Sequence, residues 1–244
     1  MSELPSVSIA IATYEMSGKG RYFLRQAFDS IYTQEYSNVQ VVVSDDSIDN
    51  EIESECHDWD ANLRIQYLRH TGSRISASAK FNRAIDACDG AIVKILCQDD
   101  LLSGPVSLQQ TVDGLTHGNV WLVSAYSHID EKNMRLGCHT PTLNSRIERK
   151  NTIGSHSGLA FLRNQQSQRF DETLLWRMDC ELYRRLFDNY GEPYYLSSET
   201  VSVRQWQGQA TNRVIKQVDK FREWTYVRRK YPKKIDKPTS KNLG

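Results

Sequence analysis

Two pairs of adjacent aspartates stand directly after apolar stretches of the sequence. Asp99 and Asp100 follow the apolar run 92–97, and Asp45 and Asp46 follow a run of β-branched residues. Adjacent carboxylates repel each other. A hard cation relieves that repulsion, because Mg²⁺ or Mn²⁺ commonly takes one or two carboxylates together with substrate phosphates. The first pair is therefore a candidate metal site and the second a candidate site for a base and ribose, with a turn or helix cap as the alternative for each.

Asp179 is a third carboxylate whose position suggests chemistry. It lies on the same helical face as the apolar or aromatic residues 3, 4, 7, 8 and 11 positions later, which are Leu182, Tyr183, Leu186, Phe187 and Tyr190. A carboxylate on the buried side of a helix loses hydration, which raises its pKa and makes it a better general base. The alternative is a carboxylate that the helix dipole favours near the N-terminus.

The order of elements that must position these residues is strand and helix in alternation. We expect strands at 7–12, 39–43, 65–68 and 92–97, separated by helices whose apolar stripes are Leu24, Ala27, Phe28 and Ile31, and Ala77, Phe81, Ala84, Ile85 and Cys88. Strands that are apolar on both faces imply an open α/β fold with a parallel sheet between helices. Ligands bind beyond the carboxyl ends of such strands, which here are 13–15, 45–46 and 98–100.

The remaining elements are expected to complete the same sheet. A helix is predicted from about 105 to 116, strands at 120–124 and 158–162, a loop-rich segment at 134–153, and a long helix at 174–190. Neither a G-x-G-x-x-G after the first strand nor a P-loop occurs in the sequence, which argues against dinucleotide dehydrogenases and P-loop NTPases. No G-x-S-x-G accompanies a serine, so a hydrolase would lack its nucleophile.

The composition predicts a soluble protein without nucleic-acid partners. The 244 residues fit one large domain, and a net charge of +1 gives no electrostatic case for nucleic acid. No run approaches the roughly 20 apolar residues of a membrane span, and five scattered cysteines suggest a reducing cytoplasm. From Arg213 onward the chain is basic, with interleaved Trp224, Tyr226 and Tyr231, which suits the inner face of an anionic membrane; a solvated final helix is the alternative.

Taken together, residues 7 to about 211 resemble the inverting glycosyltransferases of family 2, whose fold is called GT-A. The resemblance rests on Thr13-Tyr14-Glu15 after the first strand, the segment VVVSDDSIDN, Gly72 followed by Lys80 and Asn82, and the segment DGAIVKILCQDD. The segment WRMDCELYRRL is similar to the family's Glu-Asp motif, with Met178 in place of the Glu. Each motif is degenerate, but their order and spacing together make the match specific.

The resemblance implies a role for each matching residue. Asp100 would bind Mn²⁺ or Mg²⁺ and bridge it to the diphosphate, Asp99 would hold the ribose or sugar, and Asp179 would deprotonate the acceptor hydroxyl. The residues expected at the nucleotide or its sugar are Thr13, Tyr14, Asp46 at a base that is usually uracil, and Lys80 at the diphosphate or sugar. Glu15 stands where the family more often has Asn.

Two further positions bear on the resemblance. Trp206 stands where the family often has a His that helps bind the metal or diphosphate, so other ligands or a weaker metal dependence are expected. Trp206 would instead stack on a sugar or pack in the core. His156 lies in a run of small residues that matches the family's acceptor site, and the other histidines are expected to be structural.

The sequence thus predicts one catalytic domain over 1–211 with a basic C-terminal helix and tail at 212–244. Residues 1–100 would form the nucleotide-sugar half and 101–211 the acceptor half. The expected reaction is inverting transfer from a UDP-sugar to a glycan or lipid-linked acceptor in bacterial surface-polysaccharide synthesis, such as that of an O-antigen. The alternatives are a nucleotidyltransferase, faintly suggested by Gly-Lys-Gly-Arg at 18–21, and a non-catalytic nucleotide- or sugar-binding module.

Overall fold

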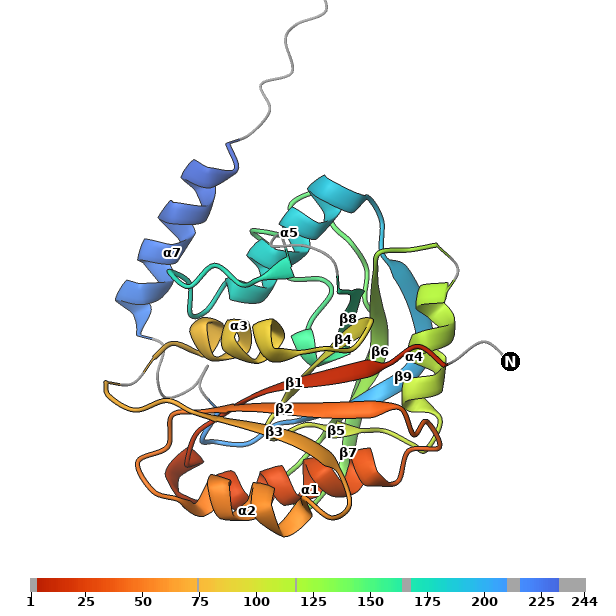
Figure 1. The fold of residues 1–244 in the computed structure, drawn as a ribbon. Coiled ribbons are helices and arrows are strands. Elements are labelled where there is room, and N and C mark those ends of the chain that lie inside the picture. Colours follow the sequence, from red (N-terminus) through yellow and green to blue (C-terminus); the bar gives the residue numbers. More distant parts are fainter. Residues whose placement is uncertain (1–3, 74, 117, 164–167, 210–215, 233–244) are drawn as a thin grey trace, which may run out of the picture.

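The computed structural model describes residues 4–73, 75–116, 118–163, 168–209 and 216–232 (Figure 1). Across these residues the chain forms one nine-stranded sheet with the strand order β3-β2-β1-β4-β8-β6-β9-β5, and β7 pairs with β6 outside this path. The sheet is curled, with helices on both faces, so the α/β fold predicted from the sequence is confirmed.

The first half of the sheet is parallel. Its strands are β1 (Val7–Thr13), β2 (Val39–Asp45), β3 (Arg64–Arg69) and β4 (Ile92–Cys97). The helices α1 (Gly20–Tyr32) and α2 (Glu51–Trp59) pack on one face, and α3 (Ala77–Ala87) packs on the other (Figure 1). All four strands were predicted within two residues at each end, although only β1, β2 and β4 are largely apolar and β3 is short and half-exposed.

The second half of the sheet is mixed and less regular. It contains β5 (Leu101–Leu102), β6 (Trp121–Ile129), β7 (Arg135–His139), β8 (Leu159–Leu162) and β9 (Tyr194–Arg204), with α4 (Ser107–Thr116) against β9. β8 runs antiparallel to both β4 and β6. The sequence did not predict β7 or β9, because their side chains are largely polar or half-exposed and show no continuous apolar run.

Two helices follow on the face of the sheet that carries α3. α5 (Met178–Tyr190) begins four residues later than predicted, and α7 (Gln217–Lys230) lies beside it (Figure 1). The predicted boundary between 211 and 212 lies outside the described residues, as do the basic residues after 232. Among the described helices, none is long and apolar enough to cross a membrane.

Candidate active site

A cavity of about 400 Å³ lies at the carboxyl ends of β1 and β4. Its size falls within the range of ligand pockets. Of the residues singled out in the sequence, Tyr14, Lys80, Asp99, Asp100, His156 and Asp179 line it. Thr13, Glu15 and Asp46 lie outside this lining, next to residues that do form it. Acidic residues from two distant parts of the sequence therefore face one space.

Lys80, which lines the cavity, and Asp46 form a buried ion pair. Lys80 Nζ lies 2.8 Å from Asp46 Oδ1 and donates to the Thr13 carbonyl at 3.0 Å. The same nitrogen lies 4.9 Å from the centre of the Tyr14 ring. The other oxygen of Asp46 accepts a hydrogen bond from the backbone N–H of Ile75, at the approach to α3. Four of the predicted residues are therefore brought together by direct contacts.

The two members of the Asp45–Asp46 pair have different surroundings. Asp45 is fully buried and accepts hydrogen bonds from Thr13 Oγ1, from the backbone and hydroxyl of Ser47, and from the Tyr67 hydroxyl. This is the turn-forming use of an aspartate. Asp45 fixes the end of β2, and Asp46 faces the neighbouring lysine instead.

Asp99 and Asp100 are both buried at the end of β4. Asp100 accepts hydrogen bonds from Ser157 Oγ at 2.6 Å and from the backbone N–H of Arg204 at 2.9 Å. Asp99 Oδ2 accepts one from Trp206 Nε1 at 2.8 Å. Burial raises the pKa of both carboxyls, and the neighbouring charge of Asp99 raises that of Asp100 further.

The chemistry of this pair fits a divalent cation. Among the described residues, no cluster of three His, Cys, Asp or Glu side chains could hold a metal, so the protein would supply one or two carboxylates. That is the usual arrangement for Mg²⁺ or Mn²⁺ with substrate phosphates and water. The hydrogen bonds to Asp100 orient its carboxylate, since each oxygen retains a second lone pair. A cation would also offset the burial that raises both pKa values and the charge of Asp99 that raises the pKa of Asp100 further.

Asp179 lines the same cavity from the first turn of α5. Asn151 Nδ2 donates to Asp179 Oδ2 at 2.8 Å, and Asn151 itself is held by two hydrogen bonds with the backbone of Gly154. Burial raises the pKa of Asp179 to about 6. An acid with this pKa is ionised near neutral pH and still basic enough to accept a proton.

Several lining residues were given no role from the sequence, namely Tyr126, Asn151, Trp176 and Gln209, whereas Gly154 belongs to the run of small residues around His156 that was expected at the acceptor site. Most come from irregular segments without periodicity. Gly154 adopts a φ of +94°, and a Cβ at this position would lie 2.0 Å from the Tyr126 hydroxyl. Only glycine meets both demands.

The structure also places the two remaining candidates. The Trp206 ring packs edge-on against Phe23 with the centroids 5.2 Å apart, in addition to its bond to Asp99. Trp206 is not among the residues that line the cavity, and it holds the Asp99 carboxylate in place through this hydrogen bond. His156 Nε2 lies 3.2 Å from Cys97 Sγ, and burial lowers the pKa of this histidine to about 4. His156 is therefore neutral at physiological pH and forms part of the cavity wall.

Residues 8–169 match the profile of the family described as glycosyl transferase family 2. The chain belongs to glycosyltransferase family 2. Among curated relatives of this family-2 chain, an uncharacterized glycosyltransferase of Rickettsia prowazekii is 23% identical over 94% of the chain and 73% of the relative. The GalNAc(5)-diNAcBac-PP-undecaprenol β-1,3-glucosyltransferase of Campylobacter jejuni is 26% identical over 47% of the chain and 37% of the relative.

Solved structures of glycosyltransferases share the fold of this family-2 chain. A fragment of S. aureus TarS in complex with UDP-GlcNAc has a TM-score of 0.72 at 15% identity, over 92% of the chain and 64% of that fragment. A mannosyltransferase from Pyrobaculum calidifontis in complex with GDP-Man and Mn²⁺ has a TM-score of 0.60 at 20% identity, over 84% and 57%. The chain therefore spans less than two thirds of either structure, and the likeness establishes the GT-A fold.

Proposed function

We propose that this glycosyltransferase moves a sugar from a nucleotide sugar to a hydroxyl of a glycan or lipid-linked acceptor. The proposed donor is a UDP-sugar, and the anomeric configuration of the sugar is inverted. The observation that carries the proposal is the cavity itself, which the Asp99–Asp100 pair and Asp179 line from different elements. The structural neighbours in complex with UDP-GlcNAc and with GDP-Man and Mn²⁺ support a nucleotide-sugar donor.

The proposed reaction is a single displacement. The acceptor oxygen attacks the anomeric carbon and forms the new C–O bond, while the bond to the diphosphate breaks and its electron pair goes to the diphosphate oxygen. Asp179 takes the acceptor proton, and Asn151 holds its carboxylate in place. Asp100, with Asp99 beside it, would hold Mn²⁺ or Mg²⁺, whose positive charge stabilises the leaving diphosphate when it is bound.

The nucleotide would lie toward β1 and β2. We assign Thr13, Tyr14 and Glu15 to its surroundings, Asp46 to the base and Lys80 to the diphosphate or sugar. The contacts of Lys80 with Asp46, the Thr13 carbonyl and the Tyr14 ring support this assignment, because they gather the four residues beside the acidic pair. Residues 1–100 would thus form the nucleotide half and 101–211 the acceptor half.

The acceptor class is proposed from a relative. The Campylobacter enzyme is named for an acceptor linked through a diphosphate to undecaprenol. We propose a lipid-linked glycan acceptor of this kind in surface-polysaccharide synthesis, and a peripheral position at the inner face of the plasma membrane.

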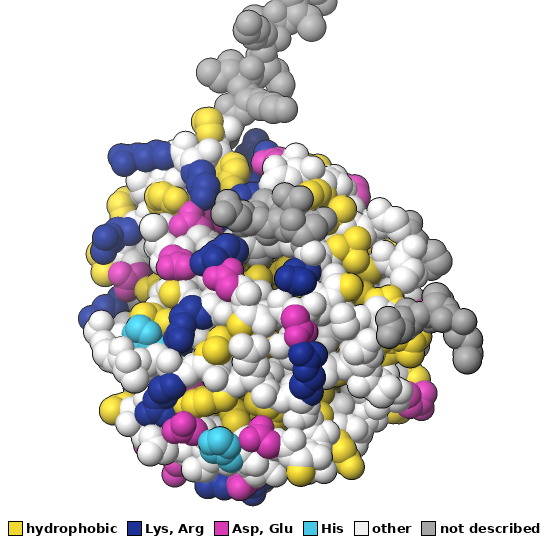
Figure 2. Space-filling view, in the orientation of Figure 1, with side chains coloured by type: hydrophobic (Ala, Val, Ile, Leu, Met, Phe, Trp, Pro, Cys, Tyr) yellow, Lys and Arg dark blue, Asp and Glu magenta, His cyan; other side chains and the backbone are white. Residues whose placement is uncertain are grey.

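The outer face of α7 supports this peripheral position at the membrane. It exposes Phe221, Val218 and Trp224, and Arg228 lies 4.2 Å over the Trp224 ring. Figure 2 shows basic and apolar side chains together over α7.

The donor is testable with a panel of nucleotide sugars. Melting temperatures with UDP-Glc, UDP-GlcNAc, UDP-Gal and GDP-Man, with and without Mn²⁺, should rise for one donor only, because a ligand of the folded state stabilises it. Nucleoside diphosphate release with that donor should then depend on an octyl glycoside acceptor. Binding without release for every acceptor would indicate a non-catalytic module and contradict the proposal.

The membrane placement is testable by flotation with vesicles that contain anionic lipid. Replacing Phe221 and Trp224 by Ser should reduce recovery with the vesicles, since both side chains leave water on binding. Tyr32, which is 55% exposed on α1, provides the matched control, and its replacement by Ser should leave recovery unchanged. Equal recovery of all variants would reject the placement.

A further inference from the structure

Glu223 of α7 is a buried carboxylate whose partners are three consecutive backbone amides. Its Oε1 accepts hydrogen bonds from the N–H groups of Leu175 at 2.7 Å and Trp176 at 3.1 Å. Its Oε2 accepts from Trp176 at 2.9 Å and from Arg177 at 2.8 Å. Only 6% of Glu223 is exposed. Such a run of N–H groups forms a concave site for an anion, and this chain fills the site with its own side chain.

These amides belong to the N-cap residue of α5, Arg177, and to the two residues before it, where acceptors for backbone N–H groups are needed. The N-cap residue, Arg177, provides no side-chain cap to this helix. The N–H groups at a helix start lack partners within the helix and form the positive end of its dipole. Glu223 supplies both an acceptor and a negative charge, in hydrogen bonds that are stronger because the acceptor is ionised. The conformation of the segment 175–177 therefore depends on a residue 46 to 48 positions further along the chain.

The segment that Glu223 holds is part of the cavity wall. Leu175 and Trp176 line the cavity, and so do Met178 and Asp179, which follow directly after Arg177. Arg177 and Lys220 both stack on the Trp176 ring, at 4.3 Å and 5.4 Å from its centre. The carboxylate of Glu223 thus fixes the backbone that carries one wall of the cavity and leads into the turn with Asp179.

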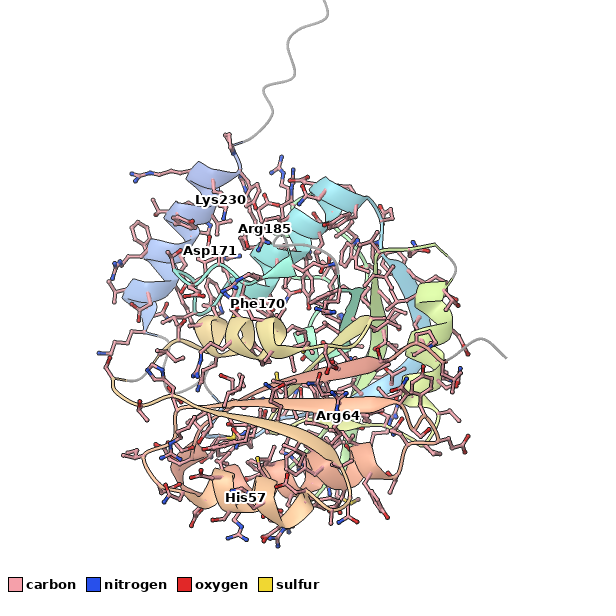
Figure 3. All side chains as sticks on the ribbon, in the orientation of Figure 1. His57, Arg64, Phe170, Asp171, Arg185 and Lys230 are labelled. Carbon is pink, nitrogen blue, oxygen red and sulfur yellow. The ribbon has the colours of Figure 1, made fainter. Side chains whose placement is uncertain are left out.

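α7 is also held to the protein by contacts that do not involve Glu223. Val227 is buried, Lys230 Nζ lies 2.7 Å from an oxygen of Asp171 and 2.9 Å from one of Glu181, and the Tyr231 hydroxyl donates to Glu181. Figure 3 shows Lys230 of α7 beside Asp171 and Arg185. The helix can therefore stay docked when Glu223 is changed, which separates positioning of the wall from attachment of the helix.

We infer that Glu223 is a positioning residue for the acceptor side of the active site, so that α7 is a functional part of the catalytic domain. The inference rests on the proposed function, because it assumes that the wall formed by 175–179 faces the acceptor. Glu223 acts through the backbone of 175–177 and touches no substrate. It lies well beyond residues 8–169, the part of the chain that matches the family profile.

The test replaces Glu223 by Gln, which keeps the shape but turns an NH₂ group toward N–H donors. Amide hydrogen exchange in the peptide containing 175–177 should become at least about tenfold faster, while peptides from the second half of α5 keep their rates. With the donor and octyl glycoside that give the highest release of nucleoside diphosphate, KM for the acceptor should rise about tenfold and KM for the donor should change less than about twofold. Glu223→Asp, which keeps the charge and shortens the side chain, should give an intermediate result and serves if the Gln variant does not fold.

Lys230→Met is the matched control, since it weakens the attachment of α7 without touching the segment 175–177. Unchanged acceptor KM in Glu223→Gln, unchanged exchange, or an equal rise of acceptor KM in Lys230→Met would each overturn the inference. Failure of the proposed function looks different, because Asp179→Asn would then retain full transfer. The exchange measurement needs no turnover and decides the structural step by itself.

Discussion

The proposed nucleotide side and the proposed acceptor side of the cavity are built in different ways. On the proposed nucleotide side, Asp46 and the Asp99–Asp100 pair follow β2 and β4, the two parallel strands that flank β1, and the sheet alone brings them to the same edge. On the acceptor side, Asp179 is oriented by Asn151 from a loop, and the segment before it is held by Glu223. The first arrangement is rigid because strands are paired along their length. The second depends on single side chains, so individual substitutions there should change acceptor handling without changing donor binding.

The largest effect is expected from Asp179→Asn. Loss of the proposed general base should lower kcat by about 10³-fold, within the range for such groups. In the unaltered protein, transfer should be lost as the pH falls through about 6, because burial raises the pKa of Asp179 and its protonated form accepts no proton. A pH–rate profile of both proteins checks this prediction. An acidic limb that persists in the variant would assign the limb to another group.

Asp100→Asn tests the nucleotide side and should lower kcat/KM by about 10²-fold, since charge on the leaving diphosphate is then less stabilised. The expected stability change has the opposite sign. A carboxyl whose pKa is raised in the folded state destabilises that state once the pH exceeds its ordinary pKa, and the amide removes this cost. The variant should therefore melt at or above the temperature of the unaltered protein at pH 7. A clear fall in melting temperature together with the loss of activity would indicate that Asp100 is structural.

Asn151→Ala sharpens the comparison, because it leaves the base present but removes its hydrogen-bond donor. We expect transfer to fall about tenfold and the acidic limb to move upward by about one pH unit, since a hydrogen bond to a charged group contributes about 1.5–3 kcal/mol. Donor KM should not change. A fall in rate with an unshifted pH profile would mean that Asn151 supports the loop around Gly154 instead.

The difference between residues that the sheet places and residues that single side-chain contacts place also explains how much of the site could be predicted from the sequence. The parallel strands and the Asp99–Asp100 pair were predictable, because a continuous apolar run followed by carboxylates is a local pattern and the sheet rule places its end. Asn151 and Glu223 act across 28 and 46 to 48 positions through irregular segments. In the sequence, Glu223 is one of two acidic residues in a basic helix, and no periodicity marks it. The polar strand β9, which supplies the Arg204 amide to Asp100, was missed for the same reason.

The smallest effect is expected from Lys230→Met, which removes the partly exposed ion pairs of α7 with Asp171 and Glu181. Solvent screening limits their contribution, so the free energy of unfolding at pH 7 should fall by about 1 kcal/mol or less. Both carboxyls have a lowered pKa in the folded protein, with hydrogen bonds from Lys230, Arg185 and their neighbours outweighing burial. Their contribution is therefore complete above about pH 5 and is lost as the pH falls through their folded pKa values. Urea unfolding of both proteins at pH 7 and at pH 3 should show the difference shrinking in acid. If the difference in unfolding free energy is the same at both pH values, the packing of the lysine side chain causes it. The attachment of α7 would then depend on apolar contacts such as Val227 more than on charge.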